Sequence, residues 1–326
     1  MAVRSLSATP TIVFLDTATI PPHITIPRPG IEHQWQEYAS TSVEELDDRL
    51  FGAEIVISNK VVLNASTLAR HPHIKLIAIA ATGTNNVDLD YCQANDIAVA
   101  NIQGYATRSV PEHVVAMMFA LKRNLLGYHQ DIAQGEWQKQ QQFCFFTHPI
   151  MDIAGSTLGL VGSGSLGQAV ASLAKGLGMT VLFAERKGAA ICREGYFPFE
   201  QVLAEADVIS LHCPLTDETT NLISTNELKA MKESAVLINT GRGGLVDEAA
   251  LVKALKEKEI AGAGVDVFTQ EPADNSNPLL ANQHLANLLL TPHVAWGSDS
   301  SIGTLLDLLM ENIEAFSRGE RLRRVV

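Results

Sequence analysis

The 326-residue sequence predicts an α/β protein made of two doubly wound parallel-sheet domains. Short apolar runs of strand length alternate with amphipathic helical segments along most of the chain, a pattern typical of parallel sheets covered by helices. In the middle of the chain, residues 157–185 run through a strand, a glycine-rich turn, a helix and a second strand that ends on an acid. The length and the apolar content of 46% suffice for two hydrophobic cores.

Composition argues against several classes of partner. The net charge of −12 arises from 24 basic and 36 acidic residues, and the one short basic run is Arg321–Arg324. We therefore expect no nucleic acid and no membrane as partners, and no apolar stretch reaches membrane-spanning length. The cysteines lack metal-ligand spacing and are typical of reduced thiols in a cytoplasmic protein, so no metal site is expected. They are Cys92, Cys144, Cys192 and Cys213.

The first hundred residues predict a small parallel sheet. The expected strands are 11–16, 54–58, 74–80 and 97–100. Between them, a capping box at Ser42–Glu45 opens a helix to Leu50, Asn64 caps a helix ending near His71, and a further helix spans 88–95.

A second capping box, Ser109–Glu112, predicts the start of a long helix whose apolar face extends to Leu125. Residues 135–149 after it are irregular and rich in aromatic side chains. They fit a loop packed by its own aromatics and, equally well, an exposed arm that contacts a second subunit.

The second half of the chain continues the alternation. With 158–161 and 181–184, the expected strands 208–211, 235–239, 263–267 and 288–290 make about six parallel strands, with the clearest helix at 247–257. An amphipathic helix at 302–317 ends the pattern. Because the dinucleotide-type unit lies mid-chain, we expect a discontinuous substrate domain (1–106 and 293–326), an inserted cofactor domain (107–292), and a cleft between them.

The glycine turn predicts a dinucleotide site. Gly162, Gly164 and Gly167 have the spacing G-x-G-x-x-G between a strand and a helix, which allows a sharp turn, a close approach to a pyrophosphate and tight helix–strand packing. Glu185 lies 18 residues beyond Gly167 (185 − 167), where a carboxylate can accept hydrogen bonds from ribose hydroxyls.

Three polar residues follow strands of the same domain. Arg242 lies in a glycine-rich turn after 235–239, Glu271 follows 263–267, and His293 follows 288–290. Taken singly, each has an ordinary explanation: a capping or surface-paired arginine, a loop carboxylate, a structural histidine. Their shared position at the carboxyl ends of parallel strands, where such sheets bind ligands, favours a catalytic set.

Together the three side chains suit hydride exchange with a carbonyl. Glu271 hydrogen-bonded to His293 would stabilise the imidazolium, and His293 would then protonate the keto oxygen or, in reverse, deprotonate the hydroxyl. Arg242 would hold and polarise a 2-keto acid through its forked donors.

These motifs resemble those of the D-isomer-specific 2-hydroxyacid dehydrogenases, in the family's order and over nearly the whole chain. The matching stretches are Gly162–Gly167, Leu237–Asp247, Gly264–Phe268 with Glu271-Pro272, and Pro292-His293. The resemblance implies a Rossmann cofactor domain inserted in a flavodoxin-like substrate domain, and it assigns catalysis to Arg242, Glu271 and His293.

The resemblance also implies further site residues. The backbone of Ala81, Thr82 and Gly83 would receive the substrate carboxylate, and an aromatic side chain such as Trp296 or Phe143 would suit closure of a pocket for a small substrate. The positions that resemble the family's cofactor contacts are Thr107, Gly162, Gly164, Ser165, Leu166, Gly167, Glu185, Arg186, Lys187, Cys213, Thr240, Gly241 and Asp266.

Within the family, residues 83–88, 58–60 and 293–296 look most like the glycerate dehydrogenase or hydroxypyruvate reductase branch, which implies hydroxypyruvate and glyoxylate as substrates and a homodimer. Glu185 replaces the family's usual aspartate and would repel a 2′-phosphate, whereas Arg186 and Lys187 would attract one. We therefore predict NAD(H) as the preferred cofactor with some use of NADP(H). Two alternatives remain: a bulkier 2-keto acid as substrate, and an NAD(H)-sensing corepressor-like binding protein, which the intact catalytic set disfavours.

Overall fold

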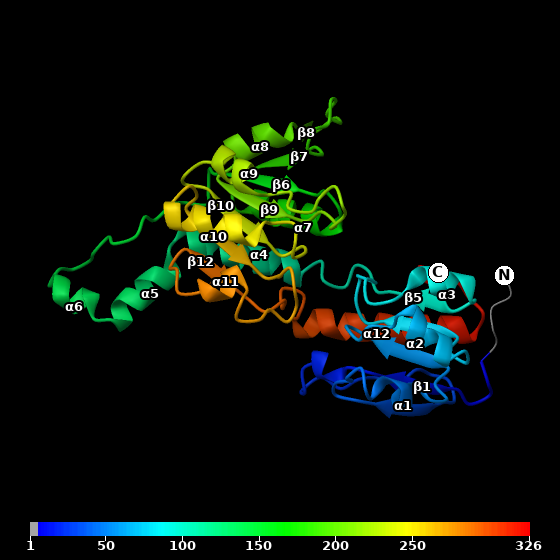
Figure 1. Ribbon diagram of the computed structural model, residues 1–326. Helices are drawn as coiled ribbons and strands as arrows, with labels where there is room; N and C mark the ends of the chain where they lie inside the picture. Colours follow the sequence, from blue (N-terminus) through cyan, green and yellow to red (C-terminus); the bar gives the residue numbers. More distant parts are fainter. Residues whose placement is uncertain (1–5) are drawn as a thin grey trace. The chain divides into compact units, whose positions relative to one another are not determined.

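The computed structural model describes residues 6–326, and the chain divides into two compact units (Figure 1). Unit 1 comprises the residues up to Tyr105 together with Ser298–Val326, and unit 2 comprises Ala106–Gly297. Each unit contains its own parallel sheet, which confirms the predicted α/β class with two sheets. The assignment of substrate and cofactor to the two units stays a prediction.

Unit 1 is a five-stranded parallel sheet in the order β2-β1-β3-β4-β5, the flavodoxin-like order. Its central strands are fully buried, which explains their continuous apolar runs. The strand missed from sequence, β2, is a polar and largely exposed edge strand. The elements are β1 (Thr11–Phe14), η1 (Thr17–Thr19), β2 (Gln34–Glu37), α1 (Leu46–Leu50), β3 (Ile55–Ser58), α2 (Ala65–Arg70), β4 (Leu76–Ile79), α3 (Leu89–Ala94), β5 (Ala98–Ala100) and α12 (Asp299–Ser317).

Local capping in unit 1 partly follows the prediction. Asn64 caps α2 through its side chain, as expected, and Asp88, the first residue of the predicted helix 88–95, caps α3 in the same way. The Ser42 box is only half formed: the Glu45 carboxylate accepts the Ser42 N–H at 3.0 Å, but Glu45 itself is the N-cap of a helix that begins at Leu46. The prediction that this helix opens at Ser42 is therefore wrong.

The helix α12 completes unit 1 although it follows unit 2 in sequence. Ser298 caps it, its apolar face is buried, and it packs against β4. The Asn312 side chain donates to the backbone oxygen of Asn101 at 3.0 Å, which ties the helix to the segment after β5.

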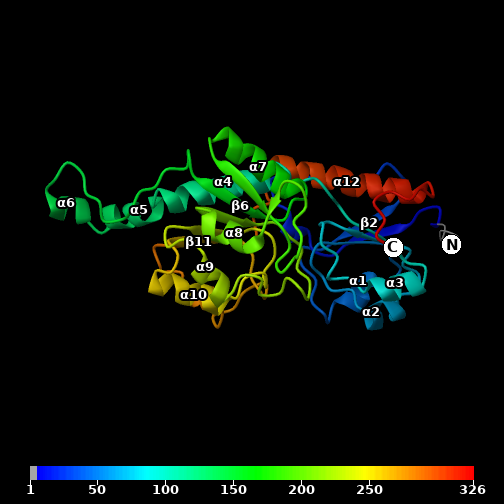
Figure 2. The same ribbon diagram turned by 90° about the horizontal axis from the view of Figure 1, so that it is seen from above.

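Unit 2 is a seven-stranded parallel sheet in the order β12-β11-β10-β9-β6-β7-β8. Figure 2 shows α4 and α7 on one side of this sheet and α8, α9 and α10 on the other. Sequence predicted about six strands because β8 has only two residues. The elements are α4 (Ser109–Lys122), α5 (Leu125–Ala133), α6 (Glu136–Gln140), β6 (Thr157–Val161), α7 (Ser165–Gly176), β7 (Thr180–Ala184), β8 (Tyr196–Phe197), α8 (Phe199–Glu205), β9 (Val208–Leu211), α9 (Thr225–Ala230), β10 (Val236–Asn239), α10 (Glu248–Glu257), β11 (Gly262–Val265), α11 (Pro278–Ala281) and β12 (Leu288–Leu290).

The region after Ser109 departs from the prediction in two ways. Ser109 does not cap α4: it lies inside the helix, and its hydroxyl donates to the backbone oxygen of Trp296 at 3.1 Å. The helix also ends before Leu125, because Asn124 adopts a left-handed conformation (φ 51°) and separates α4 from α5.

The aromatic segment 135–149 is partly helical, since it contains α6. Figure 1 shows α5 and α6 projecting from the body of unit 2. Phe143 and Phe146 are 93% and 77% exposed, so these aromatics are not packed against one another as a self-contained loop. Among residues 6–326, no helix combines the length and the apolar composition needed to cross a membrane.

Candidate active site

Adjacent strands bring the three predicted catalytic residues to one sheet edge. The strands β10, β11 and β12 are parallel neighbours, so the loops that follow them share the same edge. Backbone bonds connect these loops: the N–H of Asp266 donates to the oxygen of Asn239 at 2.9 Å, and the N–H of His293 donates to the oxygen of Asp266 at 2.7 Å.

His293 and Glu271 form a hydrogen-bonded pair. The Nδ1 of His293 lies 2.7 Å from Oε2 of Glu271, and since a carboxylate can only accept, Nδ1 carries the proton. Glu271 is fixed in turn, because its Oε1 accepts the N–H of Phe268 at 3.0 Å. The second ring nitrogen, Nε2, takes no part in this pair. The His293 side chain is 26% exposed, which leaves it accessible to a ligand.

The backbone of His293 is held in an uncommon conformation. Its φ of 54° lies in the left-handed region, which non-glycine residues rarely adopt outside functional or strongly constrained sites. The constraint comes from Asp266, whose fully buried carboxylate accepts from the Thr291 hydroxyl (2.5 Å) and from the N–H groups of Val294 (2.9 Å) and Ala295 (3.0 Å). Asp266 thus shapes the loop that carries His293.

Arg242 sits in a turn that the buried Asn239 side chain organises. Asn239 accepts the N–H of Gly241 at 3.1 Å and donates to the backbone oxygen of Arg242 at 2.9 Å. The Arg242 guanidinium donates to the oxygen of Gly241 at 2.7 Å. It is half-buried, and no carboxylate of residues 6–326 forms an ion pair with it. A half-buried guanidinium whose charge is not paired with a carboxylate of the described residues is suited to binding an anionic ligand.

The glycine turn between β6 and α7 is built as an anion cradle. Gly162 has a φ of 105°, and a Cβ there would lie 2.5 Å from the carbonyl carbon of His212. A Cβ on Gly167 would lie 2.2 Å from the oxygen of Gly162, whereas one on Gly164 would meet no atom within 4 Å. The protein's own backbone therefore fills the space beside Gly162 and Gly167, whereas the space beside Gly164, at the N-terminus of α7, is free for a ligand.

A buried hydroxyl marks a second point of fit. The Oγ1 of Thr240 is buried and has no hydrogen-bond partner among the described residues. Such a group costs about 1–3 kcal/mol when left unpaired, so a ligand group that bonds it would be favoured. With the open space at Gly164, this unpartnered hydroxyl fits the prediction of a dinucleotide site in unit 2.

The acid at the end of β7 is already engaged. Glu185 is 5% exposed, and its carboxylate is bonded to the Arg193 guanidinium. This bond, together with the N–H groups of Arg186 and Arg193, lowers the pKa of Glu185 to about 2. Lys187 is also paired, with Glu227 at 2.8 Å.

Two residues near the turn were not predicted from sequence. Arg193 has no motif that would have marked it. His212 directly follows β9, so its position at the strand edge was a usable signal. Burial lowers the pKa of His212 to about 4; its Nε2 is 2.8 Å from the Ser210 hydroxyl, and its Nδ1 has no partner within residues 6–326.

The other predicted positions are distributed over both units. In unit 1, Ala81, Thr82 and Gly83 follow β4; the Thr82 hydroxyl donates to the oxygen of Ile102 at 2.8 Å, which fixes the loop. Trp296 donates from its indole nitrogen to the oxygen of His293 at 2.9 Å. In unit 2, Thr107 precedes α4, Ser165 and Leu166 open α7, and Cys213 follows β9 against Gly162. Their contacts with substrate and cofactor stay predictions.

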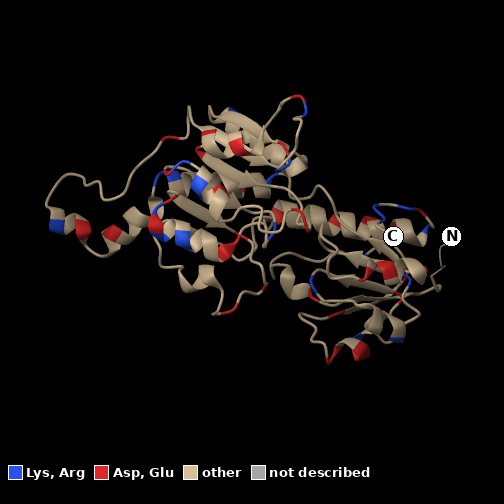
Figure 3. Cartoon of the chain, turned by 45° about the horizontal axis from the view of Figure 1, so that its top comes forward, with Lys and Arg blue, Asp and Glu red and all other residues tan. Residues whose placement is uncertain are grey.

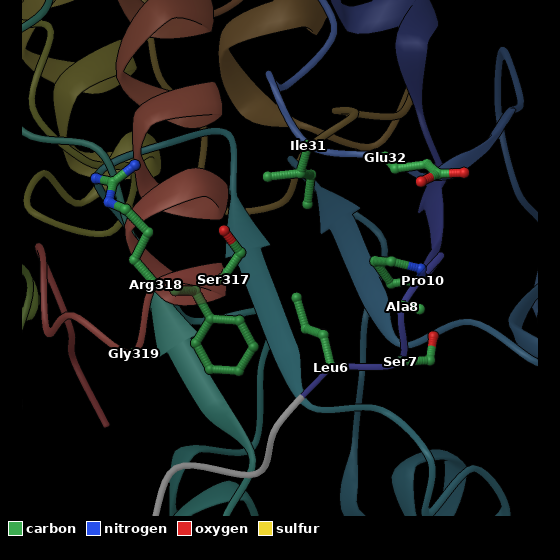
Figure 4. Close-up of a pocket in the computed structure, with 10 residues that line it drawn as sticks. Leu6, Ser7, Ala8, Pro10, Ile31, Glu32, Ser317, Arg318 and Gly319 are labelled. Carbon is green, nitrogen blue, oxygen red and sulfur yellow. The ribbon is translucent and has the colours of Figure 1, made fainter.

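A pocket in unit 1 holds none of these residues. It measures about 420 Å³ and lies between the segment before β1 and the end of α12, with Leu6, Ile31 and Arg318 among its lining residues (Figure 4).

Figure 3 shows Lys and Arg dispersed among Asp and Glu over the part of the chain that the structure describes.

Comparison with known proteins identifies what this arrangement is similar to. The sequence profile described as D-isomer specific 2-hydroxyacid dehydrogenase, NAD binding domain, matches residues 115–295. A putative 2-hydroxyacid dehydrogenase of Haemophilus influenzae is 52% identical over 94% of this chain and 97% of its own. A glycerate dehydrogenase of Methylorubrum extorquens is 48% identical over 95% and 96%. The crystal structure of D-lactate dehydrogenase from Aquifex aeolicus, complexed with NAD and lactic acid, superposes with a TM-score of 0.78 at 27% identity, covering 95% of this chain and 96% of that one.

Proposed function

This chain belongs to the D-isomer-specific 2-hydroxyacid dehydrogenase family and is an NAD-dependent oxidoreductase, and on that premise we propose that it reversibly reduces hydroxypyruvate to D-glycerate and glyoxylate to glycolate. The observation that carries the proposal is the His293–Glu271 pair, which shares its sheet edge with Arg242, a residue without an ion pair among residues 6–326.

His293 is the proposed acid and base. The nicotinamide, when bound, supplies the hydride to the carbonyl carbon. Protonated His293 gives its Nε2 proton to the keto oxygen as negative charge develops there, and hydride plus proton together complete the alcohol. Glu271, fixed by the Phe268 N–H, stabilises the imidazolium and keeps the ring oriented. In the oxidative direction, neutral Nε2 takes the hydroxyl proton.

Arg242 is the proposed anchor for the 2-keto acid. Its forked N–H donors match a carboxylate and the adjacent keto oxygen, and they favour the transition state because charge grows on that oxygen. The Asn239 side chain fixes the turn from both sides of Gly241, so the guanidinium is positioned before substrate binds.

The size of the substrate is assigned from the branch resemblance and from Trp296. The bond between its indole nitrogen and the oxygen of His293 fixes the ring next to the proposed acid, where it would limit the space for a substituent. The name of the Methylorubrum extorquens relative, glycerate dehydrogenase, is consistent with a small three-carbon acid. We also propose NAD(H) as the preferred cofactor, with measurable use of NADP(H).

Steady-state rates on four keto acids test the proposal: hydroxypyruvate, glyoxylate, phenylpyruvate and 2-ketoisocaproate, each with NADH and with NADPH. We expect the two small acids to be reduced with the higher kcat/KM. A higher kcat/KM on phenylpyruvate or 2-ketoisocaproate would refute the assignment of a small substrate in favour of a bulkier 2-keto acid. Tight NADH binding without turnover of any acid would favour a binding protein instead.

His293→Ala isolates the acid–base role. We expect kcat to fall at least 100-fold while the Kd for NADH stays within twofold, because general acid–base catalysis contributes typically 10²–10⁴-fold. His284→Ala, at an exposed histidine of the same unit, is the matched control and should keep wild-type kcat. Wild-type turnover by His293→Ala would refute the role.

A further inference from the structure

The carboxylate of Glu185 is saturated by its own protein. Its Oε1 accepts from the N–H of Arg186 (2.9 Å) and from Nη2 of Arg193 (2.8 Å), and its Oε2 accepts from the N–H (3.1 Å) and Nε (2.6 Å) of Arg193. A carboxylate offers about four acceptor positions, so all of them are used. A ribose diol can bond to Glu185 only after Arg193 withdraws.

Arg193 is the solvent-exposed partner of this pair. Its side chain is 57% exposed, whereas that of Glu185 is 5% exposed. The guanidinium also lies 3.8 Å from the ring centroid of Tyr196, whose hydroxyl donates to Ser163 in the glycine turn at 2.6 Å. The pair is thereby attached to the turn that is proposed to hold the pyrophosphate.

We propose that Arg193 sets how strongly the cofactor site discriminates between a dinucleotide with an unmodified adenosine ribose and one with a 2′-phosphate. This inference rests on the proposed cofactor site between Gly162 and Glu185. With Arg193 in place, the Glu185 charge that would repel a 2′-phosphate is compensated, and a planar guanidinium that binds phosphate through paired donors stands at the same position. Without Arg193, Glu185 presents an uncompensated charge and vacant acceptors, which suit a ribose diol.

The neighbouring basic residues are less suited to this role. Lys187 is paired with Glu227, a carboxylate of α9. Arg186 is exposed and contributes its backbone N–H to Glu185. Arg193 places two side-chain donors on the carboxylate itself, although it lies eight residues away in the sequence (193 − 185).

Titration of the full chain with NADH and with NADPH, followed by cofactor fluorescence in the absence of any keto acid, tests the proposal. In Arg193→Ala we expect the Kd for NADPH to rise at least tenfold and the Kd for NADH to stay within twofold of wild type or to fall. Arg193→Lys, which keeps the charge but loses the planar fork, should lie between wild type and Arg193→Ala. Arg123→Ala is the matched control, because Arg123 forms an exposed pair with Asp152 (2.9 Å) in the same unit.

Glu185→Gln is expected to change the preference between NADH and NADPH in the opposite direction to Arg193→Ala. Removal of the carboxylate charge should lower the ratio of the NADPH to the NADH dissociation constant, whereas Arg193→Ala should raise it. A ratio in Arg193→Ala within threefold of wild type would overturn the proposal. An equal loss of affinity for NADH and NADPH would also overturn it, because a merely structural role would weaken the binding of both cofactors alike. Because no keto acid is present, failure of the proposed substrates would not affect these outcomes.

Discussion

Asp266 shows how one buried side chain determines the position of another. By resemblance the sequence places it beside the nicotinamide, which stays a prediction. In the structure its carboxylate accepts three hydrogen bonds from residues 291–295 and lies 3.9 Å from Nε2 of His113. These bonds offset the backbone strain of about 1–3 kcal/mol that a left-handed residue such as His293 stores. We regard Asp266 as a positioning residue for His293.

His212 gives a prediction about stability and pH. Burial lowers its pKa from the ordinary value of 6.5 to about 4, so between these values the unfolded chain binds a proton that the folded protein does not. Stability is therefore fully present above about pH 6.5 and decreases as the pH falls towards 4. Between pH 7 and pH 5, we expect this group to remove about 2 kcal/mol from the free energy of unfolding.

Urea unfolding at pH 7 and pH 5 measures that difference. His212→Gln should lose less stability than wild type over this interval, because its side chain does not titrate. His284→Gln, at an exposed histidine of the same unit, should behave like wild type. The same pH dependence in wild type and His212→Gln would contradict the assignment.

At the scale of elements, Gly164 before α7 and Gly167 and Gly176 within it give three different expected results when each is replaced by alanine. Gly167→Ala places a Cβ 2.2 Å from the Gly162 oxygen and should lower the free energy of unfolding by at least about 2 kcal/mol. Gly164→Ala meets no atom within 4 Å and should keep wild-type stability, but its methyl group would occupy the space proposed for the pyrophosphate.

The control for these two changes is Gly176→Ala at the other end of the same helix, where a Cβ also meets nothing. It should be neutral or stabilise by up to about 1 kcal/mol, since alanine favours helix over glycine. Thermal unfolding and NADH titration separate the three variants. Unchanged NADH affinity in Gly164→Ala would show that the pyrophosphate does not lie over this turn.

Elements with strong local patterns were predictable, and elements without them were not. The buried strands and the helices capped by Asn64 and Asp88 follow from apolar runs and capping residues. The edge strand Gln34–Glu37 has no apolar pattern, because it is exposed and depends on pairing with β1. Ser109 looks like a cap locally, but a tertiary bond to Trp296 uses its hydroxyl.

The same distinction applies to the candidate site. Arg242, Glu271 and His293 were predictable because each follows a strand, and parallel strands share an edge. The Glu185–Arg193 pair was not predictable, since the loop that folds Arg193 back onto Glu185 has no spacing rule. His212 falls between these cases: its strand-end position is visible in the sequence, but its burial is not.

At the scale of the whole molecule, α5 and α6 present the main exposed apolar surface to be explained. Apolar side chains exposed by 37–93% gather on and after these helices: Leu125, Leu126, Ile132, Trp137, Phe143, Phe146 and Ile150. Such a surface marks an interaction site, and we predict that a second copy of the chain covers it. In a dimer with two-fold symmetry, both copies would contribute these same residues to the interface.

Sedimentation velocity tests this homodimer. The double change Phe143→Ser and Phe146→Ser should weaken dimerisation at least 100-fold, because each buried phenylalanine contributes about 1.5–3 kcal/mol and four are lost per dimer. Phe51→Ser, which alters an equally exposed phenylalanine (81%) of unit 1, should leave the dimer intact. A monomeric wild type, or a dimer that survives the double change, would exclude this surface.

The place of α12 in the sequence has a consequence for how the protein is made. Unit 2 is one continuous stretch of chain, whereas α12, the helix that packs against β4 of unit 1, is translated after all of unit 2. Domains generally fold as units during synthesis, in the order in which they leave the ribosome. We therefore expect unit 1, whose strands are translated first, to complete its fold only after α12 has left the ribosome, and so after unit 2.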